Sequence, residues 1–103
     1  MPKVKWTTPG LRDLRETAEF IAKDNPVAAK NVAGRIRKAT WLLANHPKMG
    51  RPGRSVGTRE LIIPGLPYIV AYRVRNGMIE ILRVLHTSRL WPERFQGAEC
   101  LKG

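Results

Sequence analysis

The sequence predicts an α+β domain with the element order β-α-α-β-β-β, in which an antiparallel helical hairpin packs on a mostly antiparallel sheet. Three observations support this. Two segments with apolar residues at helical spacing each begin with a capping residue and a proline, at Thr8-Pro9 and at Asn25-Pro26. Three apolar runs then follow between residues 59 and 86. The last two runs are separated by Asn76-Gly77, the pair that most strongly predicts a two-residue hairpin turn.

The first 45 residues are expected to form one short strand and two helices. Residues 3–6 alternate between lysine and apolar side chains, which is typical of an edge strand. Thr8 is expected to cap the first helix, with Pro9 at the first helical position. The second helix is expected to run from about Pro26 to Asn45, and the short link between the helices makes them antiparallel neighbours. The predicted apolar faces consist of Leu11, Leu14, Ala18 and Ile21 in the first helix and Ala29, Val32, Ala33, Ile36, Ala39 and Leu43 in the second.

The remaining residues are expected to form a loop and three strands. Residues 47–58 are rich in glycine, proline and basic side chains and predict a loop. The two-residue turn sets the register of the last two strands, pairing Arg73 with Glu80 and Ile69 with Val84. On this register one face carries Tyr72, Val74, Ile79, Ile81 and Leu85. The other face carries Ile69, Ala71, Leu82 and Val84, with Arg73 and Glu80 nearer the turn.

The composition indicates one domain with a polyanionic or acidic partner. Among 103 residues, 19 are Lys or Arg and 8 are Asp or Glu, which gives a net charge of +11. Such a charge suits nucleic acid, an acidic protein or a membrane surface; a merely soluble basic protein is the alternative. With one cysteine, Cys100, and no apolar stretch long enough for a membrane span or signal peptide, a cytoplasmic protein is expected. Residues 1–92 are expected to form the domain and residues 93–103 a loosely ordered tail.

A set of short motifs extends over residues 4–92. The most specific are EILRVLH at residues 80–86 and YRV at residues 72–74. Others are RDL at residues 12–14, FIA at 20–22, NP at 25–26 and HPKMG at 46–50. Together they resemble the RelE/ParE superfamily of toxins from bacterial type II toxin–antitoxin modules. The resemblance implies a cognate antitoxin as partner and no cofactor.

Two branches of this superfamily differ in mechanism. RelE-like members are ribosome-dependent mRNA endonucleases, whereas ParE-like members poison DNA gyrase. The ribonuclease pattern has an arginine where this chain has Tyr68, and basic residues on the preceding strand, where Arg59 fits and Leu61 does not. After the last strand it has an arginine with a later tyrosine or histidine, and no tyrosine follows Arg89 in this chain. The strings YRV and RVLH are more similar to ParE. The resemblance therefore implies a gyrase-inhibiting toxin without catalytic residues, and a RelE-like mRNA interferase is the alternative.

Residue types alone would permit a ribonuclease site. RNA cleavage without a metal needs a general acid or base and cations near the phosphate, and histidine titrates in the useful range. His86 is the better candidate and His46 the other, although a histidine hydrogen-bonded at a strand end is the alternative for His86. The accompanying residues would be Arg59, Arg73, Arg83 and Arg89. The lack of a Cys/His/Asp cluster argues against a metal site, and a basic nucleic-acid-binding module without a reading helix is a further alternative.

Apolar side chains without an evident internal partner predict an antitoxin-binding surface rimmed by charge. The resemblance implies an antitoxin with a ribbon-helix-helix DNA-binding domain and an acidic, partly disordered C-terminal segment that folds on binding. Its predicted contacts are Leu14, Phe20, Ile21, Lys30, Arg37, Trp41, Ile69, Arg73, Leu82, Val84 and Arg89. The predicted contacts to gyrase, or to the ribosome in the alternative, are Arg51, Arg54, Arg59, Arg89 and Trp91. A solvated helix face and an ordinary surface loop are the alternatives for these charges.

Overall fold

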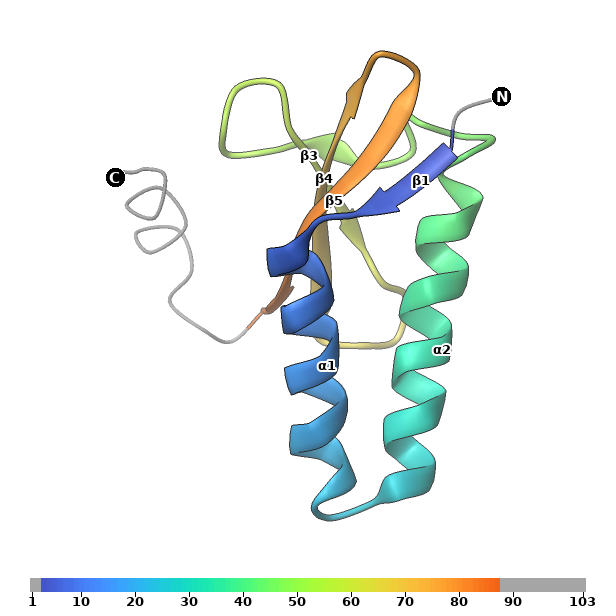
Figure 1. The fold of residues 1–103 in the computed structure, drawn as a ribbon, viewed down its shortest axis with the longest axis vertical. Helices are drawn as coiled ribbons and strands as arrows, with labels where there is room; N and C mark the ends of the chain where they lie inside the picture. The colour runs from blue at the N-terminus through green and yellow to red at the C-terminus, as the bar shows by residue number, and fades with distance from the viewer. Residues whose placement is uncertain (1–2, 88–103) are drawn as a thin grey trace.

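A computed structural model describes residues 3–87, which form two antiparallel helices and one five-stranded sheet (Figure 1). The elements are β1 (Lys3–Trp6), α1 (Thr8–Ala22), α2 (Pro26–Leu42), β2 (Arg51–Pro52), β3 (Arg59–Ile62), β4 (Tyr68–Arg75) and β5 (Met78–His86). The predicted α+β class and its main elements are confirmed. The expected tail at residues 93–103 lies outside the described residues, as do Arg89 and Trp91. Neither described helix has the length and apolar character that crossing a bilayer requires.

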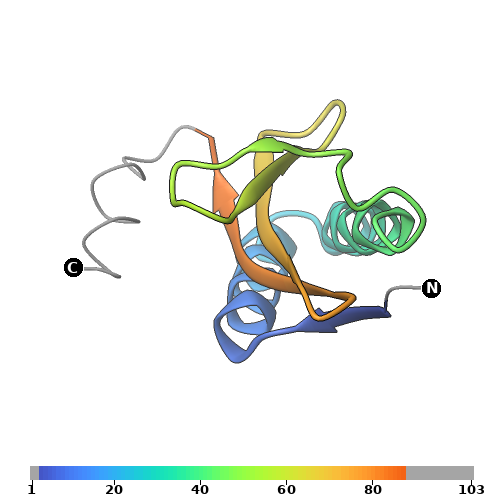
Figure 2. The ribbon, with the colours of Figure 1, turned by 90° about the horizontal axis from the view of Figure 1, so that it is seen from above.

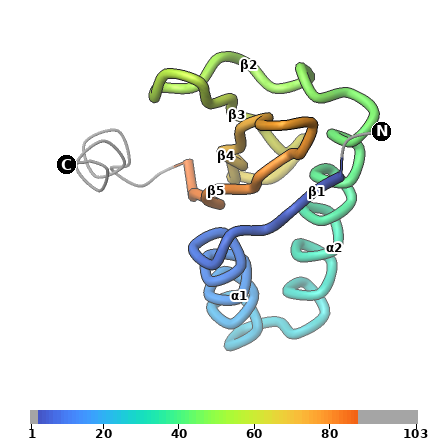
Figure 3. Tube along the Cα trace, turned by 45° about the horizontal axis from the view of Figure 1, so that its top comes forward, coloured from blue at the N-terminus to red at the C-terminus, as the bar shows by residue number. Residues whose placement is uncertain are grey.

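The sheet is mostly antiparallel, as predicted, but it is mixed, because one strand pair is parallel. Its strand order is β1-β5-β4-β3-β2, and β1 pairs with β5 in parallel while all other pairs are antiparallel. β1 is thus an edge strand, as its alternating sequence predicted, and it lies beside the last strand of the described chain (Figure 3). β2 falls inside the segment that was expected to be a loop, because Arg51 and Pro52 pair with the start of β3.

Both helices begin with a side-chain cap followed by proline. The hydroxyl of Thr7 accepts a hydrogen bond from the Gly10 amide at 3.2 Å, so the first cap lies one residue before the predicted Thr8. Proline is tolerated in either early position because the first helical amides have no partner within the helix. Asn25 caps α2 as predicted, accepting from the Ala28 amide at 3.0 Å. α2 ends at Leu42, three residues before the predicted end.

The core lies between the helices and one face of the sheet. Figure 2 shows α2 within the curve of the twisted sheet and α1 beside β5. Ile36 and Leu43 are fully buried against the sheet, together with Val70, Tyr72, Ile79 and Ile81. The predicted helix faces are therefore largely correct, although Leu11 remains 45% exposed.

A β-bulge changes the predicted register halfway along the hairpin. From the turn to Tyr72 opposite Ile81 the pairing is as predicted, but Ala71 then lies opposite Arg83 and Ile69 opposite Leu85. Leu82 is the extra residue of β5, and every side chain beyond it changes face. Val84, predicted on the face away from the helices, is consequently part of the core with 5% exposure.

Candidate partner-binding surfaces

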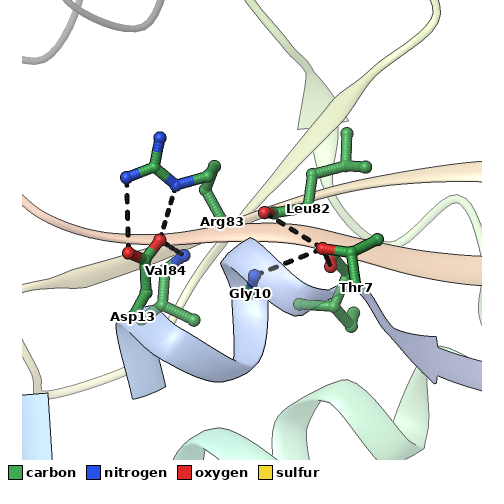
Figure 4. Close-up of polar contacts among 7 residues, drawn as sticks. Thr7, Gly10, Asp13, Leu82, Arg83 and Val84 are labelled. Atoms are coloured by element: carbon green, nitrogen blue, oxygen red, sulfur yellow. Dashed lines mark hydrogen bonds and ion pairs between the residues drawn. The ribbon is translucent and has the colours of Figure 1, made fainter. Parts of the chain in front are cut away.

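α1 is joined to β5 by side chains that take the place of a neighbouring strand. β1 pairs with β5 only as far as Ile81, so the backbone of β5 beyond it needs other partners. The Thr7 hydroxyl donates to the Ile81 carbonyl at 2.7 Å, and Asp13 Oδ2 accepts from the Val84 amide at 3.0 Å (Figure 4). Asp13 Oδ2 also accepts from Nε of Arg83 at 2.6 Å. The RDL motif thus has a structural role that its sequence did not reveal.

A hollow of about 400 Å³ lies between α1 and the end of β5. His86 lines it, and its ring packs edge-on against Tyr68 with a centroid separation of 5.1 Å. Arg83, Asp13 and Phe20 also line the hollow. One histidine and one of the candidate arginines are therefore brought together, but the arginine is held by the carboxylate of Asp13.

The other candidate arginines of a ribonuclease site lie elsewhere. Arg73 is opposite Glu80, five residues along β4 from the Tyr68–His86 pair, which is about 16 Å at strand spacing. An odd separation along a strand also places Arg73 on the opposite face from Tyr68. Arg59 donates to the Gly50 carbonyl at 2.7 Å. Within the described residues, the predicted catalytic set is not gathered into one site.

A second, more open hollow of about 410 Å³ lies between β1, α1 and α2. Trp41, 67% exposed, is on its α2 side beside Arg37, and Trp6 and Leu11 line the opposite walls. Trp41 and Arg37 belong to the predicted antitoxin-binding set. Trp6 and Leu11 do not, although the alternation of residues 3–6 already indicated one apolar face on β1.

The other described residues that were predicted to contact the antitoxin differ in how far their side chains are exposed. Phe20 and Lys30 are exposed, and Ile21 and Leu82 are partly buried. The side chains of Leu14, Ile69 and Val84 are only 4–5% exposed, so the expectation that the two strand residues offer free apolar area is wrong. The bulge explains this for Val84, because it turns the side chain inward.

The basic loop before β3 is organised around one buried acid. Glu60 is 4% exposed and forms ion pairs with Arg51 at 3.3 Å and Arg54 at 3.7 Å. It also accepts a hydrogen bond from the Arg54 amide at 3.2 Å. Burying a carboxylate is costly unless it is paired and hydrogen-bonded, so these arginines hold the loop in place. Two of the predicted target contacts therefore also have a structural role.

The tip of the β4–β5 hairpin carries another paired acid. Glu80 Oε1 accepts from Nε of Arg73 at 2.5 Å, and Oε2 lies 3.4 Å from Nη2 of Arg75. The hydrogen bond from Arg73 lowers the pKa of Glu80, assisted by the positive charges of Arg73, Arg75 and Lys5. The predicted Arg73–Glu80 pair is confirmed. No group of three or more potential metal ligands occurs within residues 3–87.

Comparison of the sequence with known proteins places it among toxins. The family model described as "ParE toxin of type II toxin-antitoxin system, parDE" matches residues 4–91. The chain is 44% identical over 91 residues to the protein Y4kP of Sinorhizobium fredii, covering 88% of this chain and 94% of the relative. It is 33% identical over 90 residues to toxin RelE2 of Caulobacter vibrioides, covering 87% of this chain and all of the relative.

Solved structures give the same result. A chain of the chromosomal ParDE toxin–antitoxin system from P. aeruginosa superposes with a TM-score of 0.76 at 25% identity, covering 85% of this chain and 98% of that one. A chain of the RelBE2 toxin–antitoxin complex from Mycobacterium tuberculosis superposes with a TM-score of 0.55 at 28% identity, covering 84% and 99%. The chain therefore belongs to the ParE toxin family of type II toxin–antitoxin systems, within the RelE/ParE superfamily.

Proposed function

We propose that this toxin acts in the cytoplasm as a ParE-like inhibitor of DNA gyrase, trapping the topoisomerase with cleaved DNA without bond chemistry of its own. The observation that carries the proposal is the separation of His86 from Arg73. A metal-free ribonuclease needs its acid or base and its phosphate-stabilising cations around one phosphate. Here about 16 Å of strand and the thickness of the sheet lie between the two side chains.

The proposed antitoxin is ParD-like and binds the hollow between β1, α1 and α2. Trp41 and Leu11 offer apolar area there, and Arg37 offers a positive rim for an acidic segment. Trp and Arg are the residue types most often found at the energetic centre of an interface. A segment that folds as it binds would place apolar side chains against Trp41 and acidic ones near Arg37.

A RelE-like mRNA interferase is the second candidate. It is favoured by the 33% identity to toxin RelE2 and by the hollow in which His86 and Arg83 lie together. In that case His86 would transfer the proton and Arg83 would stabilise the phosphorane charge. Arg83 would first have to release Asp13.

Induction of the toxin in cells without antitoxin separates the two functions. Gyrase inhibition predicts filamentation and induction of the DNA-damage response, and purified gyrase should accumulate cleaved DNA when the toxin is added. The ribonuclease predicts rapid loss of translation with mRNA cuts in phase with ribosomes. Phased cuts with intact chromosomal DNA would overturn the gyrase proposal.

A further inference from the structure

Four basic side chains form a grid on the face of the sheet away from the helices. The register places Lys5, Glu80 and Arg73 in one row across β1, β5 and β4, and Lys3, Met78 and Arg75 in the next row towards the turn. Residues paired across strands project from the same face, so all four cations lie together. Figure 3 shows the three strands side by side. We call Lys3, Lys5, Arg73 and Arg75 the basic grid.

One carboxylate is too little to neutralise the basic grid. Glu80 is the acid within the rows, and it is already bound by Arg73 and Arg75. Lys3 and Lys5 are exposed, and the side chain of Arg75 remains 59% exposed despite its ion pair. The grid therefore presents an excess of three positive charges to solvent. Its rows are about 7 Å apart along the strands, and its outer strands about 10 Å apart.

The chemistry of the grid favours a phosphate backbone over a protein surface. Protein interfaces have an apolar centre from which charged residues are depleted. Among the large apolar side chains that residues 3–87 expose, Trp41 lies on α2, across the sheet from the grid. Ile62 is on the same face as the grid, but it lies opposite Ile69, four residues along β4 from Arg73. Val74, next to Arg73, projects from the opposite face, and Met78 within the grid is partly buried. Interfaces with nucleic acid, in contrast, are polar, strongly basic and dominated by phosphate contacts.

We propose that the basic grid binds the sugar–phosphate backbone of a nucleic acid without reading its sequence. Lys3 and Lys5 on the edge strand and Arg75 at the hairpin tip contact phosphate oxygens, and Arg73 joins them while remaining paired with Glu80. Neither described helix lies on this face of the sheet, so no helix of residues 3–87 can enter a groove from it to read base edges. None of the four residues lines the hollow beside His86 or the hollow beside Trp41, so this binding uses neither the alternative ribonuclease site nor the proposed antitoxin-binding surface.

The test is the salt dependence of binding to a labelled 16-base-pair DNA duplex and to a single-stranded RNA of the same length. Each phosphate neutralised on duplex DNA contributes about −0.9 to the slope of log K against log salt. The double variant Lys3→Gln/Lys5→Gln should reduce the slope by about 1.8, equivalent to about 60-fold weaker binding at 0.1 M salt. Lys23→Gln/Lys38→Gln, exposed at the end of α1 and on α2, is the matched control with the same net charge. The control should leave the slope almost unchanged.

Glu80→Gln supplies a test in the opposite direction, because it removes the one negative charge of the grid and should tighten binding. Circular dichroism and thermal unfolding verify that each variant is folded. Equal losses for the two double variants would mean that binding follows net charge alone, and would overturn the proposal. The proposal would also be overturned if the grid variant lost affinity for a polyglutamate peptide but not for DNA or RNA. That result would mean that the surface binds acidic protein. Comparing duplex DNA with RNA identifies which nucleic acid is preferred.

Discussion

The carboxylate of Asp13 accepts a hydrogen bond from Nε of Arg83 at 2.6 Å and thereby connects the first helix to the last strand across 70 residues of sequence. The side chains of Asp13 and Arg83 are 13% and 35% exposed, so the pair is partly shielded from water. The same carboxylate accepts from the Val84 amide. This contact orients α1 against β5.

Replacing Asp13 should destabilise the domain more than an exposed acid would. Asp13→Ala removes three hydrogen bonds and leaves the Val84 amide without its acceptor, so the free energy of unfolding should fall by about 2–3 kcal/mol. Asp13→Asn should cost less, because its amide oxygen still accepts from Val84. Urea unfolding provides the measurement, with Glu19→Ala on the exposed side of α1 as control. Equal losses for Asp13→Ala and Glu19→Ala would contradict the assigned role.

Two glycines of the helices should respond to alanine in opposite ways. A Cβ at Gly10 would lie 2.6 Å from the Ile81 carbonyl oxygen, a backbone atom that cannot move aside cheaply. Gly10→Ala should therefore lower the free energy of unfolding by about 1–3 kcal/mol. A Cβ at Gly34 meets nothing within 4 Å. Gly34→Ala should therefore raise the free energy of unfolding by about 0.5–1 kcal/mol, because alanine has the higher helix propensity. Thermal unfolding of both variants tests these two expectations. If Gly10→Ala stabilised the protein, α1 would have to lie farther from β5 than the 2.6 Å distance at Gly10 indicates.

Glu80 should make stability depend on pH in the acid range. Its pKa is lowered from 4.5, chiefly by the hydrogen bond from Arg73, so the folded chain keeps this carboxylate ionised to lower pH than the unfolded chain does. The resulting stabilisation is fully present above about pH 4.5 and is lost as the pH falls through the lowered pKa. The difference in unfolding free energy between wild type and Glu80→Gln should be constant from pH 7 to 5 and shrink below pH 4.5. A difference that stays constant down to pH 3 would refute this coupling.

His86 separates the two proposed mechanisms at the level of one side chain. If the toxin inhibits gyrase, His86→Ala should leave growth inhibition largely intact, provided that the variant folds without the ring contact to Tyr68. If it cleaves mRNA, loss of the acid or base should cost about 10²–10⁴ in rate. His86→Phe keeps an aromatic ring against Tyr68 and controls for packing. Abolished toxicity in both folded variants would count against the gyrase proposal.

Trp41 should have a large effect on the rate at which the antitoxin dissociates from the toxin. Truncating a central aromatic residue of an interface commonly costs about 2 kcal/mol or more, which is about 30-fold in the dissociation rate. Trp41→Ala is therefore expected to shorten the lifetime of the toxin–antitoxin complex by that factor, measured by surface plasmon resonance. Val27→Ala, also exposed on α2, is the control. Association should slow with added salt if acidic residues meet Arg37. Unchanged dissociation for Trp41→Ala would place the antitoxin elsewhere.

Local signals in the sequence predicted the elements of the fold well. Asn76 has the positive φ of 53° that its turn requires, and the pairing next to the turn followed from it. Asn25 caps α2 because its side chain competes for a free helix amide, which is a property of the residue itself. Such features depend on two to five neighbouring residues and can be read directly from the chain.

Features that depend on distant residues could not be predicted. The bulge at Leu82 occurs where β5 leaves β1 and meets α1, a junction formed by residues over 70 positions apart. The parallel pairing of β1, the short β2 and the burial of Ile69 likewise depend on tertiary contacts. For the candidate sites the residue types were informative, but the distance between His86 and Arg73 required the register and the faces of the sheet.

The parallel pairing of β1 with β5 also determines when the domain can form. A ribosome releases β1 first and β5 last of the described elements, and β5 lies between β1 and β4 in the sheet. Until Met78 to Ile81 have been synthesised, the first strand has no partner and the helices have no complete surface to cover. Such distant pairings slow folding and leave apolar surface exposed during synthesis. The folded form of residues 3–87 therefore arises only after β5 has been translated.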